Sequence, residues 1–105
     1  MTIEFGQEYL QELYERDSCR DKKHRFQPQV VKTYQKRVDT LMAAVRKEDL
    51  FVFQSLGFEA LHGDKEGLFS VRVDYHYRLE FSIREVGSDP IVTICTLQEL
   101  SNHYQ

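Results

Sequence analysis

The sequence predicts a single α+β domain in which helices come first and an antiparallel sheet of about four strands follows. Two patterns carry this expectation. In the first half of the chain apolar residues recur with the spacing of a helix, and from about residue 58 onward they alternate with polar residues as in strands. Because 105 residues provide for one modest hydrophobic core, we expect one domain over residues 1–105.

The N-terminal half is expected to hold a short strand and two helices that pack on the sheet. Residues 2–5 alternate and suit a strand, and residues 7–16 carry the pattern of an amphipathic helix. A polar, charged loop follows over residues 17–27. Pro28 suits the first turn of a helix, and the long apolar stripe after it predicts a helix over residues 28–47.

The second half contains four strand candidates joined by turn-forming residues: 58–62, 67–73, 77–85 and 91–98. Side chains alternate between the two faces of a strand, so the apolar faces of the two middle strands must coincide. That requirement places Arg72 directly opposite Arg78 and Ser70 opposite Glu80. The three residues 74–76 then form the connection.

Two arginines directly opposite each other are expected to have a negatively charged group beside them, because like charges across neighbouring strands repel. A carboxylate on the same face can be this group, and Glu80 is the candidate. A phosphate can be it as well, since guanidinium groups bind phosphate bidentately. The register alone leaves both explanations open. Lys65 and His76, in the turns on either side, could add to a phosphate site or simply be solvated, and Arg84 lies on the same strand face.

Charge and cysteine content narrow the class of protein. The net charge of −3 argues against a general nucleic-acid binder, yet half of the 14 basic residues lie in residues 20–37. This block is either a local positive field or a solvated helix face. The two cysteines lack C-x-x-C spacing and the four histidines lack metal-ligand spacing. We therefore expect idle thiols, no metal and no other cofactor.

Targeting signals and membrane segments are not expected. No apolar run approaches the roughly 20 residues of a transmembrane helix. The first residues, MTIEFGQEYL, lack the basic and apolar regions of a secretory signal. The expected location is the cytoplasm, with no membrane partner.

The segment LHGDKEGLFSVRV over residues 61–73, followed by YRLEF over residues 77–81, resembles the RelE/HigB superfamily of bacterial toxins. That family shows a leucine–x–glycine, a charged turn ending in glycine, an S-V-R-V strand and an aromatic–arginine strand start. Among its branches the chain looks most like HigB, the plasmid-maintenance type. The resemblance implies a RelE-like fold and a metal-independent endoribonuclease that cuts mRNA, often on the ribosome. It also implies a cognate antitoxin of the HigA or RelB kind.

The resemblance also implies roles for particular residues. Arg72 and Arg78 match the sheet arginines of the family and would clamp the phosphate while the ribose 2′-OH attacks it. HigB-type chains commonly end in a Tyr–His pair, which here stands reversed as His103 and Tyr104. His103, with an ordinary pKa of about 6.5, suits a general acid or base. Tyr104 could donate a proton or stack on a base, and His76 is an alternative proton donor.

Two other functions fit the same fold. Proteins of the ParE branch inhibit DNA gyrase and are not nucleases, and a non-toxic relative could serve only to bind the antitoxin or RNA. The combination of paired strand arginines with a terminal histidine and tyrosine favours RNA cleavage. Tyr9, Leu13 and the link 51–53 either complete the core or form an apolar surface that an antitoxin covers.

Overall fold

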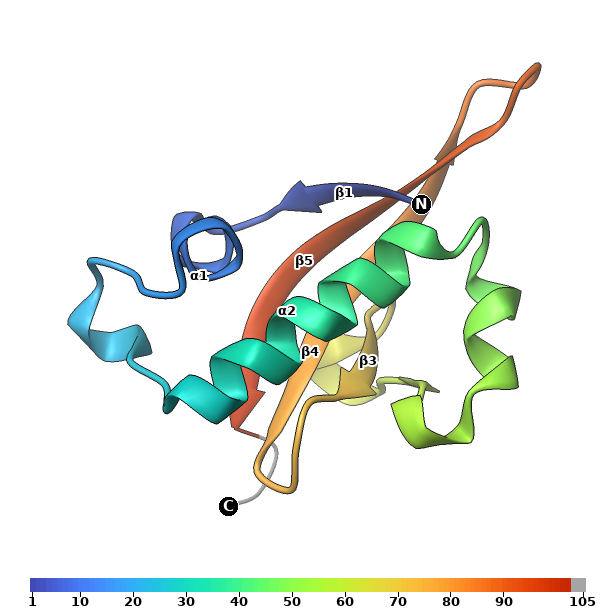
Figure 1. The fold of residues 1–105 in the computed structure, drawn as a ribbon. Coiled ribbons are helices and arrows are strands. Elements are labelled where there is room, and N and C mark those ends of the chain that lie inside the picture. Colours follow the sequence, from blue (N-terminus) through green and yellow to red (C-terminus); the bar gives the residue numbers. More distant parts are fainter. Residues whose placement is uncertain (103–105) are drawn as a thin grey trace.

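Two helices lie across one face of a five-stranded sheet in the computed structural model, which describes residues 1–102 (Figure 1). The helices are α1 (Glu8–Arg16) and α2 (Pro28–Ala43). The strands are β1 (Thr2–Phe5), β2 (Glu59–Ala60), β3 (Phe69–Arg72), β4 (Tyr77–Val86) and β5 (Val92–Asn102), arranged in the order β1-β5-β4-β3-β2. Short 3-10 helices occupy Lys22–His24, Lys47–Val52, Gln54–Leu56 and Gly63–Lys65. The predicted α+β class is confirmed.

The antiparallel part of the sheet has the predicted register. Phe69 pairs with Phe81, Ser70 with Glu80, Val71 with Leu79 and Arg72 with Arg78. The side chain of Asp74 accepts hydrogen bonds from the backbone nitrogens of His76 and Tyr77, each at 2.8 Å, and so shapes the connection between β3 and β4. The match of apolar faces was therefore sufficient to fix this pairing.

The sheet as a whole is mixed rather than antiparallel. β1 lies parallel to β5, with Thr2 opposite Ile94 and Phe5 opposite Leu97. The alternation of residues 2–5 indicates a strand but does not identify the neighbouring strand, so the position of β1 in the sheet could not be predicted from the sequence pattern. β5 also runs to Asn102, four residues further than predicted, and its pairing with β4 has a register shift between Glu80 and Phe81.

The helix α2 ends at Ala43, four residues earlier than the prediction of 28–47. The side chain of Asp49 accepts hydrogen bonds from the backbone nitrogens of Val45 and Arg46, at 2.9 and 3.2 Å. These bonds begin the next 3-10 helix and compete with continued α-helix. The amino group of Met1 also donates to backbone carbonyls at the end of α2, including that of Leu41 at 3.3 Å. As a result Val45, which falls inside the predicted helix 28–47, is 75% exposed.

The core lies between the helices and the sheet. Its largest fully buried side chains include Tyr34 of α2 and Phe81 of β4. Tyr9 and Leu13 of α1 are buried, so these two residues complete the core, whereas Phe51, Val52 and Phe53 are 61, 74 and 57% exposed. Both cysteines are free thiols.

Within residues 1–102, none of the helices has the length and apolar character needed to cross a membrane.

Candidate functional site

Two guanidinium groups converge on the sheet face opposite the helices. Arg72, at the end of β3, is the cross-strand partner of Arg78, at the start of β4. Both approach Gly57 from the preceding loop: a methyl group placed there would lie 3.6 Å from Nη1 of Arg78 and 3.7 Å from Nε of Arg72. Gly57 has φ +57°, a conformation that favours glycine, and it ends the 3-10 helix before β2.

Arg78 is fixed within the protein. Its side chain is buried, its Nε donates to Oγ of Ser70 at 2.8 Å, and its Nη2 donates to the carbonyl of Gly57. Burial lowers the pKa of Arg78, the carboxylate of Glu59 opposes that shift, and the positive charge of Arg72 adds to it. The guanidinium remains charged because arginine loses its proton only at very high pH. Arg78 therefore supplies a positive charge at a set position.

Arg72 is exposed, and its guanidinium forms no ion pair with any carboxylate in the described part of the chain. Its backbone carbonyl accepts a hydrogen bond from Nε of Arg37, on α2, at 2.6 Å. Arg37 thereby brings a further guanidinium to this end of β3. The exposed side chain of Arg72 is thus available to an anion that approaches the sheet.

Glu59 provides a carboxylate beside the arginine pair. It lies on β2 opposite Ser70, its side chain is 51% exposed, and its Oε1 is 3.6 Å from Nε of Arg78. Sequence reasoning missed this residue. Extending the β3 register to the predicted strand 58–62 would have placed Glu59 on the same face as the arginines, because residues opposite one another share a face.

Lys65 and Glu80 form another charged pair on this face. Nζ of Lys65 lies 3.0 Å from Oε1 and 2.8 Å from Oε2 of Glu80, whose residue is only 7% exposed. The hydrogen bond to Glu80 raises the pKa of Lys65. The carboxylate that the sequence offered to the two arginines is therefore bound by the lysine of the neighbouring turn.

The remaining predicted site residues lie further out or outside the described residues. Arg84 is near the far end of β4, where its Nη1 is 3.3 Å from Oε1 of Glu4. His76 occupies the exposed turn between β3 and β4. His103 and Tyr104 lie outside the described residues 1–102, directly after Asn102, which pairs with Tyr77.

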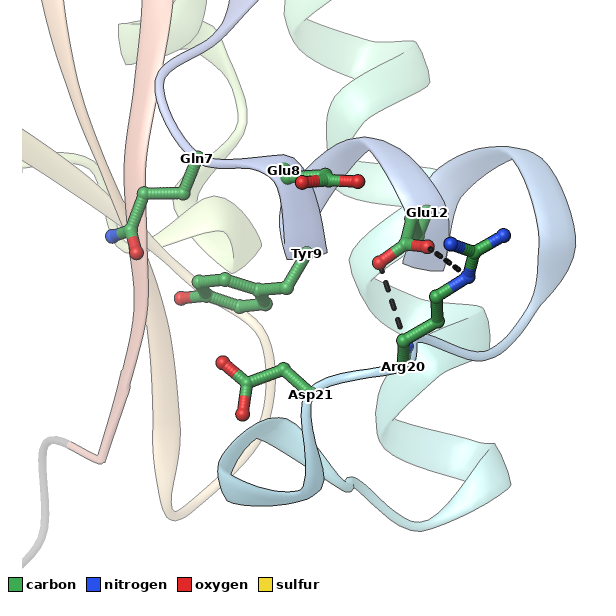
Figure 2. A pocket seen from close by; sticks show the side chains of 6 residues that line it. All are labelled: Gln7, Glu8, Tyr9, Glu12, Arg20 and Asp21. Atoms are coloured by element: carbon green, nitrogen blue, oxygen red, sulfur yellow. Dashed lines mark hydrogen bonds and ion pairs between the residues drawn. The ribbon is translucent and has the colours of Figure 1, made fainter.

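A pocket elsewhere on the molecule has the wrong charge for a phosphate. Figure 2 shows this pocket, of about 530 Å³, between the start of α1 and the loop after it. Its lining includes the carboxylates of Glu8, Glu12 and Asp21, and its one cation, Arg20, lies 3.9 Å from Glu12. The residues predicted for the site do not line it.

The part of the chain that the structure describes contains no group of three or more His, Cys, Asp or Glu residues placed to hold a metal ion.

The arrangement of the two helices on the sheet is shared with a solved structure of a small bacterial toxin. A solved structure, the YoeB/ParE toxin from Agrobacterium tumefaciens, matches with a TM-score of 0.61 over 99% of this chain and 100% of that one. At 14% identity this likeness shows the shared fold alone.

Sequence comparison gives the family. The model for the HigB-like toxin, described as the RelE-like toxin of the type II toxin–antitoxin system HigB, matches residues 3–92. Toxin HigB-1 of Vibrio cholerae serotype O1 (strain ATCC 39315 / El Tor Inaba N16961) is 34% identical over 82 residues, which are 77% of this chain and 82% of that protein. The chain belongs to the HigB-like toxins of type II systems, and a cognate antitoxin is its partner.

Proposed function

We propose that this toxin is a metal-independent endoribonuclease that cleaves messenger RNA. One observation carries the proposal: two arginines from adjacent strands converge beside Gly57, one buried and fixed, the other exposed with no carboxylate partner among residues 1–102. A phosphodiester is an anion that fits such a pair. Fixed cations stabilise the charge that develops on a phosphate during attack more than they stabilise the ground state.

The reaction can be assigned to residues of this face. The ribose 2′-oxygen attacks the neighbouring phosphorus, the bond from phosphorus to the 5′-oxygen breaks, and a 2′,3′-cyclic phosphate and a 5′-hydroxyl result. Arg72 binds the non-bridging oxygens of the phosphate. Arg78, which is fixed within the protein, contributes a second positive charge that stabilises the negative charge developing on these oxygens. Glu59 takes the proton from the 2′-hydroxyl, because its half-exposed carboxylate lies beside the same guanidinium.

The departing 5′-oxygen needs a proton donor. His103 is our candidate, and Tyr104 either assists or stacks on the neighbouring base. Support comes from their position in the chain, since β5 pairs Ser101 with Arg78 and both candidates follow within a few residues. His76, in the turn next to Arg78, is the alternative donor.

The ribosome is the proposed place of action, and the cytoplasm the proposed location. A net charge of −3 gives the chain little general attraction for RNA. A ribosome holds the message extended and single-stranded, so it can present a scissile bond that the toxin alone would bind weakly.

The test compares purified toxin with Arg72→Ala on a defined message, with and without ribosomes and with EDTA. We expect new 5′-hydroxyl ends inside the coding region in the presence of EDTA, more of them with ribosomes, and few with Arg72→Ala. Intact messages together with double-strand DNA breaks in cells would replace this proposal with inhibition of gyrase. If both the messages and the DNA stay intact although the toxin binds its antitoxin, the protein would be a non-toxic binding module.

A further inference from the structure

The strand β4 has an open edge over its second half. β3 pairs with β4 only from Arg78 to Phe81, whereas β4 continues to Val86 with β5 on its other side. No strand among residues 1–102 lies beside β4 beyond Phe81 on the β3 side. Figure 1 shows β4 and β5 running past the short β3 as a two-stranded ribbon.

Backbone groups of two residues point out from this edge. The backbone nitrogen of Val73 donates to the carbonyl of Tyr77 at 3.0 Å, so Tyr77 directs its backbone groups towards β3. In an antiparallel ladder every second residue does the same. Ile83 and Glu85 therefore present their N–H and C=O groups to the open side, where an added strand would find both donors and acceptors.

A groove of about 200 Å³ runs beside the same edge. It is lined by residues 46–48 after α2 on one side and by Ile83, Arg84 and Glu85 of β4 on the other, together with Phe69 of β3 and Thr93 of β5. The aromatic surface continues beyond the groove: Phe58 stacks on Phe69 at 5.5 Å between ring centroids, and the 61% exposed Phe51 contacts Phe58 at 5.2 Å. The groove thus has apolar contact area for side chains of an added strand.

The cation beside this aromatic surface lacks a carboxylate. Nζ of Lys47 lies 5.3 Å from the ring centroid of Phe69. Glu48 and Glu85 also line the groove, yet no carboxylate of residues 1–102 comes within ion-pair distance of Lys47. An incoming carboxylate would complete this site.

We propose that the antitoxin docks at this edge by adding an extended segment to β4 beside Ile83 and Glu85. Alternate side chains of that segment are apolar and pack on Phe69, and one of its carboxylates pairs with Lys47. The occupant is an extended polypeptide because only a backbone offers donors and acceptors at the spacing of a sheet edge. The inference rests on membership of the type II toxin family and not on the proposed nuclease activity.

Amide hydrogen exchange tests the proposal directly. The probe is the protein encoded by the open reading frame adjoining the gene of this toxin, purified in complex with the isotope-labelled toxin. We expect the amides of Ile83 and Glu85 to exchange fast in the free toxin and to become protected by at least about tenfold in the complex. Unchanged exchange of both amides in the complex would overturn the proposal. Protection of these amides in the absence of antitoxin, increasing with the concentration of the toxin, would also overturn the proposal, because a second copy of the toxin would then occupy the edge.

Two variants test the same edge by affinity. Glu85→Pro removes an N–H that no described strand uses, and proline is tolerated at such an edge. Lys47→Glu reverses the charge in the groove. Both should keep growth arrest and bind the antitoxin at least about tenfold more weakly, whereas the control Lys32→Glu, exposed on α2, should bind as the unchanged toxin does. Equal affinity of all three would overturn the proposal, whatever the outcome for RNA cleavage.

Discussion

Lys65 binds both oxygens of Glu80, the carboxylate that the sequence offered to the two opposed arginines. Glu80 lies on the same sheet face as Arg72 and Arg78, but its oxygens are 2.8 and 3.0 Å from the lysine nitrogen. Neither arginine forms an ion pair with it. The arginine pair is thus left with the half-exposed Glu59 beside one member, an arrangement that favours a bound phosphate.

Replacing Lys65 by methionine should destabilise the toxin. The variant leaves the buried carboxylate of Glu80 without its cation, and an unsatisfied buried group costs about 1–3 kcal/mol. Urea unfolding at pH 7 measures this loss. The double variant Lys65→Met/Glu80→Met should recover part of it, because no buried charge remains.

The pH dependence of the same pair has a definite sign. The bond to Glu80 raises the pKa of Lys65 above its usual 10.5. Its contribution to stability is therefore complete below the unfolded-state pKa and is lost as the pH rises through the folded-state pKa. The difference between Lys65→Met and the unchanged toxin should persist from pH 7 to 9 and shrink above pH 10.5. A difference that disappears already at neutral pH would contradict this assignment.

Arg72→Ala and Arg78→Ala should separate binding of the phosphate from stability. Arg72 is exposed, so its loss should lower RNA cleavage by about 10²–10³-fold and change the free energy of unfolding by less than about 0.5 kcal/mol. Loss of Arg78 should lower both, since the hydroxyl of Ser70 and the carbonyl of Gly57 lose their donor, at about 1–3 kcal/mol. RNA cleavage and urea unfolding of each variant measure the two effects. Full cleavage by Arg72→Ala would remove it from the site.

Glu59→Gln tests the proposed general base. The amide keeps the size of the side chain but cannot take a proton, so the cleavage rate should fall by about 10²–10⁴-fold. RNA binding should be unchanged or tighter, because a negative charge beside Arg78 is removed. Single-turnover cleavage and equilibrium binding separate the two. A control is Glu85→Gln, on the same sheet but at the far end of β4. Equal rates for both variants would exclude Glu59 as the base.

The sequence was sufficient for the fold class and for the central register. Apolar alternation in β3 and β4 admits one pairing, and that pairing places Arg72 opposite Arg78. The place of β1 could not be predicted because its four residues match more than one neighbour. The end of α2 depends on hydrogen bonds made by Asp49 and by the amino group of Met1. Both groups lie outside the helix, so the spacing of its apolar residues could not predict where it ends.

The chemistry of the site was only partly predictable for a related reason. The face of each strand follows from its pattern, but ion-pair partners depend on how turns fold back over that face. Lys65 reaches Glu80 because its turn folds over the sheet, and Gly57 meets Arg78 because the loop before β2 does the same. Arg84, on the same face by period, pairs with Glu4 because β1 lies beside β5.

His103 and Tyr104 can be tested without reference to their structure. His103→Ala should slow cleavage of an ordinary RNA by about 10²-fold, within the range for general acid catalysis, and leave unfolding by urea unchanged. An RNA in which sulfur replaces the 5′-bridging oxygen has a leaving group that needs no proton. On that substrate His103→Ala should cleave as fast as the unchanged toxin, while Arg72→Ala stays slow because the phosphate still needs its cation. Equal impairment of His103→Ala on both substrates would show that the histidine does not protonate the leaving group. The same comparison with Tyr104→Phe and His76→Ala then identifies which of the three donates the proton.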